Sequence, residues 1–195
     1  MDSGLLRCAV SHHLGGHGGS LDDLTQAAAL WCQKDPEAAV VLWAQRLAIE
    51  ALVQSGNVGL RELWLPDFFS GARAATQATG GTTLIGEDTG RGWLLSGRLY
   101  GVPNLPWEGF SLVAPVRLGP GNAGWVLLRS EEDGLSLHPE PEAPRFAQSS
   151  LQLNRVFFRE DEWLGGPDMA DLLAPIGHAL APCRPCPPAL KTLAT

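Results

Sequence analysis

Histidine and cysteine are the residue types in this chain best suited to metal or redox chemistry. His12, His13 and His17 form a local cluster, and Cys183 and Cys186 have the spacing of a redox motif. A metal site needs three or four convergent ligands, usually with cysteine or carboxylate among them. A reactive dithiol needs a helix N-terminus that lowers a thiol pKa. Since these histidines lie among glycines and these cysteines among prolines, we expect a solvent-facing loop and a frayed tail.

Carboxylates also occur close together, as Glu87 with Asp88 and as the run from Glu131 to Asp133. A general acid and base require two carboxylates that flank a substrate. Adjacent carboxylates at turns are usually solvated instead, so no catalytic pair is inferred from these residues.

Composition limits the classes of function. Hydrophobic residues make up 45% and charged residues 18% of the 195, which is enough for a real core. The net charge of -7 and the scattered basic residues argue against a nucleic-acid partner. The sequence contains no run of 18 apolar residues, so no membrane span is expected. The N-terminus lacks the features of a secretory signal. A cytoplasmic location is expected by default, in agreement with the sparse cysteines.

The expected elements that would position any site change from helices to strands near residue 71. Ser20 is the expected N-cap of a helix from Leu21 to about Lys34, and an Asp-Pro-Glu start begins a second helix that runs to Ser55. A short helix is expected from Gly59 to Leu65, where Pro66 should stop it.

From residue 71 to about 166, short apolar runs alternate with turn residues, which predicts an antiparallel barrel or sandwich. Val156 breaks the alternation of its run. A last short helix is expected from Asp168 to about Leu180. The clearest strand candidates are 93–97, 111–116, 124–128, 135–137 and 151–158.

The order of these segments resembles the acyl-CoA dehydrogenase family over roughly residues 14 to 166. The family's Gly-Gly-x-Gly loop before a helix is matched by residues 15–19. Its strand of the form Leu-x-Gly-x-Lys-x-Trp-Ile-Thr-Asn is matched by residues 95–104. The strands that close its middle domain are matched by residues 134–137, 149–158 and 163–165.

The resemblance implies an α+β fold in three parts. Residues 1–70 would be a partial N-terminal helical domain, 71–166 an antiparallel barrel or sandwich of the family's middle-domain type, and 167–195 a short helix with a proline-rich tail. The family oxidises acyl thioesters with FAD, and its proton-abstracting Glu lies in a C-terminal helical domain. We expect that domain to be missing here, so no catalytic residue is assigned.

The flavin positions implied by the resemblance are degenerate. Thr76 and Gln77 stand at the start of the family's Thr-Glu-Pro-x-x-Gly-Ser motif, with Gln replacing Glu. Gly101, followed by Val102, stands where the family has a tryptophan against the flavin, and Pro103 where a threonine donates a hydrogen bond. Proline has neither a hydroxyl nor an amide hydrogen, so we expect weak or absent FAD binding.

For an acyl-CoA ligand, the resemblance implies Thr82 and Ser149 as substrate-binding residues. The leading hypothesis is an acyl-CoA dehydrogenase-like oxidoreductase that is truncated and catalytically incomplete alone. The alternatives are a binding or scaffold module that has lost FAD, and a remnant without selected activity. Apolar faces left by a missing domain would favour self-association or a protein partner.

Overall fold

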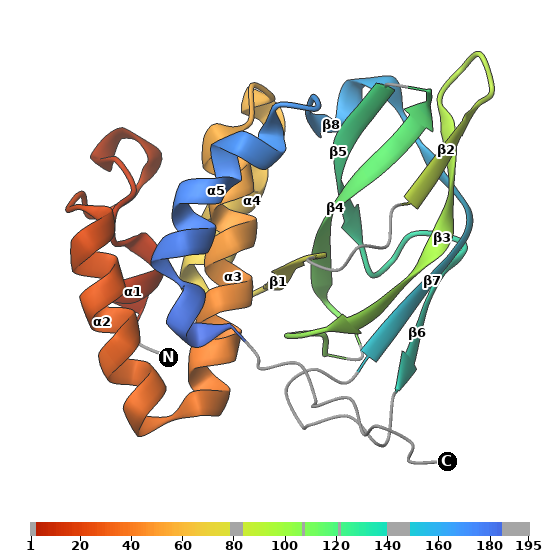
Figure 1. The fold of residues 1–195 in the computed structure, drawn as a ribbon. Helices are drawn as coiled ribbons and strands as arrows, with labels where there is room; N and C mark the ends of the chain where they lie inside the picture. Colours follow the sequence, from red (N-terminus) through yellow and green to blue (C-terminus); the bar gives the residue numbers. More distant parts are fainter. Residues whose placement is uncertain (1–2, 79–83, 107, 121, 140–148, 185–195) are drawn as a thin grey trace, which may run out of the picture.

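The computed structural model describes residues 3–78, 84–106, 108–120, 122–139 and 149–184. A layer of helices lies beside a curved sheet (Figure 1). The α-helices are α1 (Ser3–Arg7), α2 (Leu21–Lys34), α3 (Pro36–Gln54), α4 (Val58–Ser70) and α5 (Met169–Ala179). The strands are β1 (Ala74–Gln77), β2 (Leu84–Asp88), β3 (Trp93–Val102), β4 (Phe110–Gly119), β5 (Asn122–Arg129), β6 (Leu135–Pro139), β7 (Ser149–Phe158) and β8 (Trp163–Gly165). Short 3₁₀ turns are η1 (His12–Leu14), η2 (Glu160–Glu162) and η3 (Ala181–Cys183).

The expected starts of α2 and α3 are confirmed. The Ser20 hydroxyl accepts from the Asp23 amide at 3.2 Å, and the Asp23 carboxylate accepts from the Ser20 amide at 2.8 Å. This reciprocal pair satisfies amides that the first turn leaves free. Asp35 caps α3 in the same way, accepting from the Ala38 amide at 3.0 Å.

The expectation that Pro66 ends its helix is wrong, because α4 continues to Ser70 with Pro66 inside it. A proline in a helix removes one backbone hydrogen bond. The turn beyond it buries Phe68 and Phe69 completely, which offsets that loss. Gly71 then ends the helix in the left-handed conformation, with φ of 72°.

The α+β class and the mostly antiparallel sheet are confirmed, but the sheet does not close into a barrel. Its described strands run in the order β6-β7-β3-β2-β4-β5-β8, so β6 and β8 end the path instead of pairing with each other. β4 pairs in parallel with β1 at its start and with β2 near its end. These parallel pairs leave one edge of β4 shared between two short strands.

The break in alternation at Val156 marks a β-bulge. β7 pairs with β3 through Leu95 opposite Val156 and Gly97 opposite Leu153, with a register shift between the two pairs. Arg155 takes a left-handed φ of 55° at this point. The extra residue returns Val156 and Phe158 to the buried face of the strand.

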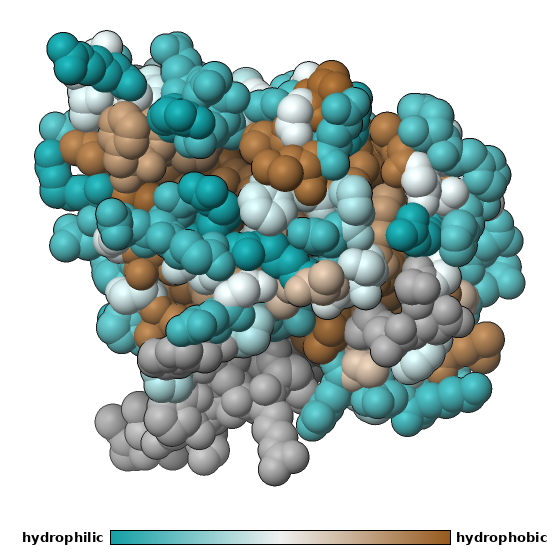
Figure 2. Space-filling model, turned by 180° about the vertical axis from the view of Figure 1, so that it is seen from behind, coloured by the Kyte–Doolittle hydropathy of each residue, from teal (hydrophilic) through white to brown (hydrophobic). Residues whose placement is uncertain are grey.

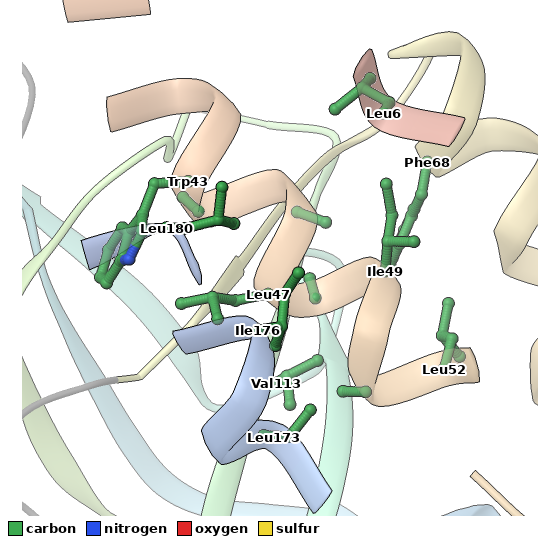
Figure 3. Packing of buried hydrophobic residues seen from close by; sticks show 14 of the residues in the cluster. Leu6, Trp43, Leu47, Ile49, Leu52, Phe68, Val113, Leu173, Ile176 and Leu180 are labelled. Carbon is green, nitrogen blue, oxygen red and sulfur yellow. The ribbon is translucent and has the colours of Figure 1, made fainter. Parts of the chain in front are cut away.

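Two clusters of buried apolar side chains pack on the two faces of the sheet. One fills the curved interior of the strands, with Leu95, Leu112 and Leu151 among its members. The other joins the helices to the opposite face. Figure 3 shows part of this second cluster, where Leu47, Val113, Leu173 and Ile176 gather between α3, α5 and the sheet.

The expected last helix is confirmed as α5, which packs back on α3 (Figure 1). One apolar cluster thus contains residues of the N-terminal helices, of the strands and of the C-terminal helix α5. The division of the chain at residues 70 and 166 therefore stays a prediction. None of the described helices is long and apolar enough to cross a membrane.

Candidate functional site

A cavity of about 400 Å³ lies where α3, the end of β1, β5 and α5 meet. Pockets of about 300–1,000 Å³ are typical of small-molecule sites. Most of the lining is apolar, and its polar members are Gln77, His178 and Arg184. The full lining is Trp43, Leu47, Gln77, Ala78, Trp125, Ala170, Leu173, Ala174, Gly177, His178 and Arg184.

Gln77 brings an unsatisfied polar group to this cavity. It is the last residue of β1 and lies opposite Val113 of β4, on the helix-facing side of the sheet. Its Oε1 atom is buried and accepts no hydrogen bond within the described part of the chain. An unpaired buried acceptor costs about 1–3 kcal/mol. The Oε1 atom itself is closed off, so other atoms of Gln77 line the cavity.

The cavity combines apolar walls with two basic side chains. Trp43, Leu47 and Trp125 form apolar walls, and each is buried. His178 and Arg184 supply the titratable groups. Among the described residues no carboxylate lines the cavity, so the carboxylate base of the expected reaction is not provided there.

A buried glutamine holds the wall beside this cavity in place. Gln45 of α3 donates through Nε2 to the Phe68 carbonyl at 3.1 Å and to the Arg73 carbonyl at 3.0 Å. Its Oε1 accepts from the Ala75 amide at 2.7 Å and from Asn104 at 3.0 Å. We call these five residues the Gln45 hub, and it ties α3, the end of α4, β1 and the turn after β3 together.

Asn104 links this hub to the strand that carries Gln77. Its Nδ2 also donates to the Ala75 carbonyl at 2.9 Å, and its own φ of 58° places it in the left-handed region. Asparagine tolerates that conformation better than most residues. Asn104 occupies the last position of the strand motif by which the sequence resembles the family.

Arg46, the next residue of α3, has a contrasting environment. Its side chain is fully buried, and no described group accepts a hydrogen bond from Nε, Nη1 or Nη2. Glu50 Oε2 lies 3.5 Å from Nη2. Burial lowers the pKa of the Arg46 guanidinium, and the negative charge of Glu50 opposes that change.

The predicted flavin positions do not converge on one site. Thr76 is fully buried and lies opposite Leu112, a member of the interior cluster, so it faces away from Gln77. Its Oγ1 atom has no hydrogen-bond partner within the described residues. Of the predicted flavin positions, only Gln77 lines the cavity.

The other predicted flavin positions lie at the end of β3. Gly101 is exposed with φ of 61°, and no atom of the described residues outside its chain neighbours lies within 4 Å of the point where a side chain would begin. Val102 and Pro103 are buried, and Pro103 brings no donor. The residues present therefore do not fit a flavin ring in the manner that the resemblance implies.

Of the predicted substrate residues, Ser149 does not line the cavity. Ser149 is half-buried at the start of β7, where it pairs with Val102 on one side and Pro139 on the other. Thr82 lies outside the described residues. No sequence motif pointed to Trp43 or His178, but Gln45 could have been noticed as an amide within the apolar run of α3.

The histidine cluster forms local contacts within its loop. His12 Nδ1 lies 3.1 Å from the Gly16 carbonyl, and His13 Nδ1 lies 2.7 Å from the Ser11 hydroxyl. Within the described part of the chain, no three His, Cys, Asp or Glu side chains converge on a metal-sized site.

The expected fraying of the tail is wrong for Cys183. This residue is 2% exposed in η3 and contacts Cys32 of α2. Cys186 lies outside the described residues.

Comparison with solved structures places the fold. The chain is similar to PigA with FAD and proline, with a TM-score of 0.78 and 17% identity over 92% of this chain and 53% of that one. It is similar to acyl-CoA dehydrogenase complexed with FAD from Bacillus anthracis, with a TM-score of 0.73 and 20% identity over 92% and 34%. It is also similar to the Tcur3481-Tcur3483 steroid ACAD G363A variant, with a TM-score of 0.68 and 26% identity over 93% and 50%.

No family model and no curated protein matches the sequence. The structural matches define the class: the fold is that of the acyl-CoA dehydrogenases and related flavoenzymes. The chain spans about half the length of PigA and of the steroid ACAD.

Proposed function

We propose that this protein binds the acyl part of an acyl thioester in the cavity between α3, β1, β5 and α5 and does not oxidise it alone. The observation that carries the proposal is the lining of that cavity. Apolar side chains line the cavity beside the amide of Gln77, and none of the described lining residues is a carboxylate that could remove a proton. The divergent flavin positions support the same conclusion, because Thr76 faces away from Gln77 and Gly101 has no side chain to hold a ring.

Binding can be followed through tryptophan fluorescence, since Trp43 and Trp125 both line the cavity. Titration with acyl-CoAs of increasing chain length should give saturable changes, whereas free coenzyme A should give none. The response should shrink when Trp43 and Trp125 are replaced by phenylalanine. No saturable change with any acyl-CoA would overturn the proposal.

A matched pair of variants tests the cavity itself. Gln77→Leu removes the side-chain amide, whose N–H can donate to the thioester carbonyl, and should weaken acyl-CoA binding about fivefold, the effect of one hydrogen bond. Thr76→Val alters the neighbouring residue on the opposite face and should leave affinity unchanged. An equal effect of both variants would show that the acyl group binds elsewhere.

The absorbance spectrum tests the cofactor separately. We expect the purified protein to show no flavin band and to gain none after incubation with FAD. Yellow protein with stoichiometric FAD would contradict the argument from Gly101 and Pro103.

A second candidate function is a subunit whose active site is completed by another chain. It is favoured by the similarity to the Tcur3481-Tcur3483 steroid ACAD, whose name joins two proteins. Seven large apolar side chains of the described residues are exposed, Leu30 and Leu63 most of all, and could contact a partner. Figure 2 shows apolar surface interspersed with hydrophilic residues on one face.

This second candidate is tested by co-expression with products of neighbouring genes. A stable complex that oxidises an acyl-CoA, as neither chain does alone, would support it. Absence of both complex and activity in every pairing would remove it.

A further inference from the structure

Two cysteines far apart in the sequence meet at the contact between α2 and the segment after α5. Cys32 donates from Sγ to Cys183 Sγ across 2.7 Å, and Cys183 donates from Sγ to the Ala28 carbonyl at 3.5 Å. Ala28 and Cys32 lie one turn apart on α2, so η3 rests on a single face of that helix. Both thiols are free in this structure.

The environments of the two thiols differ in a way that suits stepwise exchange. Cys32 is half-buried and reachable by a small reagent, whereas Cys183 is 2% exposed. Burial, followed by the contact with Cys32, raises the pKa of Cys183 to about 12. Reaction with an external disulfide therefore begins at Cys32, because exchange requires access and a thiolate.

We propose that Cys32 and Cys183 are a redox site whose disulfide fixes the C-terminal segment on α2 and holds Arg184 at the cavity. The oxidant is a low-molecular-weight disulfide such as oxidised glutathione. The Cys32 thiolate attacks one of its sulfurs and releases one thiolate. Cys183 then loses its proton and attacks Cys32 Sγ, which releases the second. Two protein thiols are oxidised and one external disulfide is reduced to two thiols.

The sequence spacing of Cys183 and Cys186 suggests another partner for Cys183, so the contact with Cys32 makes a distinct prediction. Sulfurs that already touch need only a small approach to reach the bond length of about 2.05 Å. The bond would close a loop across most of the chain, since the two residues are 151 positions apart. Such a long closure restricts the unfolded chain strongly.

The link to ligand binding comes from Arg184, which follows Cys183 directly and lines the cavity. Oxidation would reduce the freedom of Arg184 before a ligand arrives. This part of the inference rests on the proposed function, and pre-ordering predicts about threefold tighter acyl-CoA binding by the oxidised protein.

The bond is tested in full-length protein with Cys8 and Cys186 replaced by serine. Incubation of this two-cysteine variant in its folded state with oxidised glutathione should remove the mass of two hydrogens. A control that also carries Cys183→Ser should instead gain one glutathionyl group, since Cys32 then has no partner. A stable glutathione adduct on the two-cysteine variant, or no reaction, would overturn the proposal.

Wild-type protein provides a second measurement that does not depend on how the variants fold. Non-reducing peptide mapping after oxidation should recover a Cys32–Cys183 peptide pair. Recovery of Cys183 bonded to Cys186 or Cys8 would overturn the assignment.

The measurement of acyl-CoA affinity is independent of the mass measurement. Equal acyl-CoA affinities of the oxidised and reduced protein would overturn the role assigned to Arg184. If neither form binds acyl-CoA, the proposed function fails while the mass result still decides whether the disulfide exists.

Discussion

The two faces of the sheet differ in the hydrogen bonding of their buried polar groups. The interior face packs leucine, valine and phenylalanine side chains around Thr76, whose hydroxyl has no described partner. The helix-facing side holds the Gln45 hub, with its hydrogen bonds, and the cavity with Gln77. The family-like motif of β1 is divided between these faces, because successive residues of a strand point in opposite directions.

This contrast separates structural support from binding capacity. The hub satisfies its buried amide and so contributes to the joint between helices and sheet. Gln77 and Thr76 each leave a polar atom unsatisfied, but only Gln77 belongs to the lining of the cavity. A buried polar group thus indicates a site only when a cavity accompanies it.

The largest expected effect is the loss of the hub. Gln45→Ala leaves the Ala75 amide and the Phe68 and Arg73 carbonyls without their partner, and should lower the free energy of unfolding by about 3 kcal/mol. Urea denaturation measures this change. Gln26→Ala on the exposed face of α2 is the control and should cost less than about 0.5 kcal/mol. Similar losses from both variants would mean that the hub is not the main joint.

Replacement of the charged pair that begins at Arg46, the next residue of α3, should have the opposite effect on stability. Arg46→Met combined with Glu50→Gln removes both buried charges and should raise the free energy of unfolding by about 2 kcal/mol, whereas Arg46→Met alone should lower it, because Glu50 then loses its partner. Arg117→Met at an exposed position is the matched control, with little expected change. A destabilised double variant would show that the ion pair outweighs the desolvation of both groups.

On the interior face, Thr76→Val should raise the free energy of unfolding by about 1 kcal/mol, because it removes an unsatisfied hydroxyl and keeps the side-chain shape. Chemical denaturation measures this gain, with Thr25→Val as a control, since the Thr25 hydroxyl donates to the Leu21 carbonyl at 2.8 Å. A loss of stability at Thr76 would indicate that its hydroxyl is satisfied in solution.

The smallest expected effect on stability concerns the ion pair between Arg73 and Glu131. The hydrogen bonds from Arg73 lower the pKa of Glu131 from 4.5 to about 2. A carboxyl with a lowered folded pKa adds stability above its unfolded pKa and loses it as pH falls. Since the Glu131 side chain is 57% exposed, Glu131→Gln should cost only about 0.5 kcal/mol at pH 7.

Denaturation at several pH values checks the sign of this effect. The difference between wild type and Glu131→Gln should disappear as pH falls from about 4.5 toward 2. Glu87→Gln is the control, because both members of its pair with Arg155 are largely exposed. A difference that grows on acidification would contradict the assignment to Arg73.

Local interactions made several elements predictable. Ser20 and Asp35 cap their helices through atoms three residues away, so short sequence windows contain the whole signal. The bulge before Val156, by contrast, depends on the pairing of β7 with β3, and the alternation of the run did not predict it. Pro66 was misjudged, because the burial of Phe68 and Phe69 that keeps α4 intact depends on distant partners.

The sequence by itself determined the helix starts, most strands and the order of segments that resembles the acyl-CoA dehydrogenases. Only the tertiary structure decided that the sheet stays open, that Gln77 and Thr76 face different surroundings, and that Cys183 meets Cys32 instead of lying in a frayed tail. The physical reason is distance along the chain. Capping and alternation act over a few residues, whereas the Gln45 hub, the cavity and the cysteine pair join segments that become neighbours only when the helices pack on the sheet.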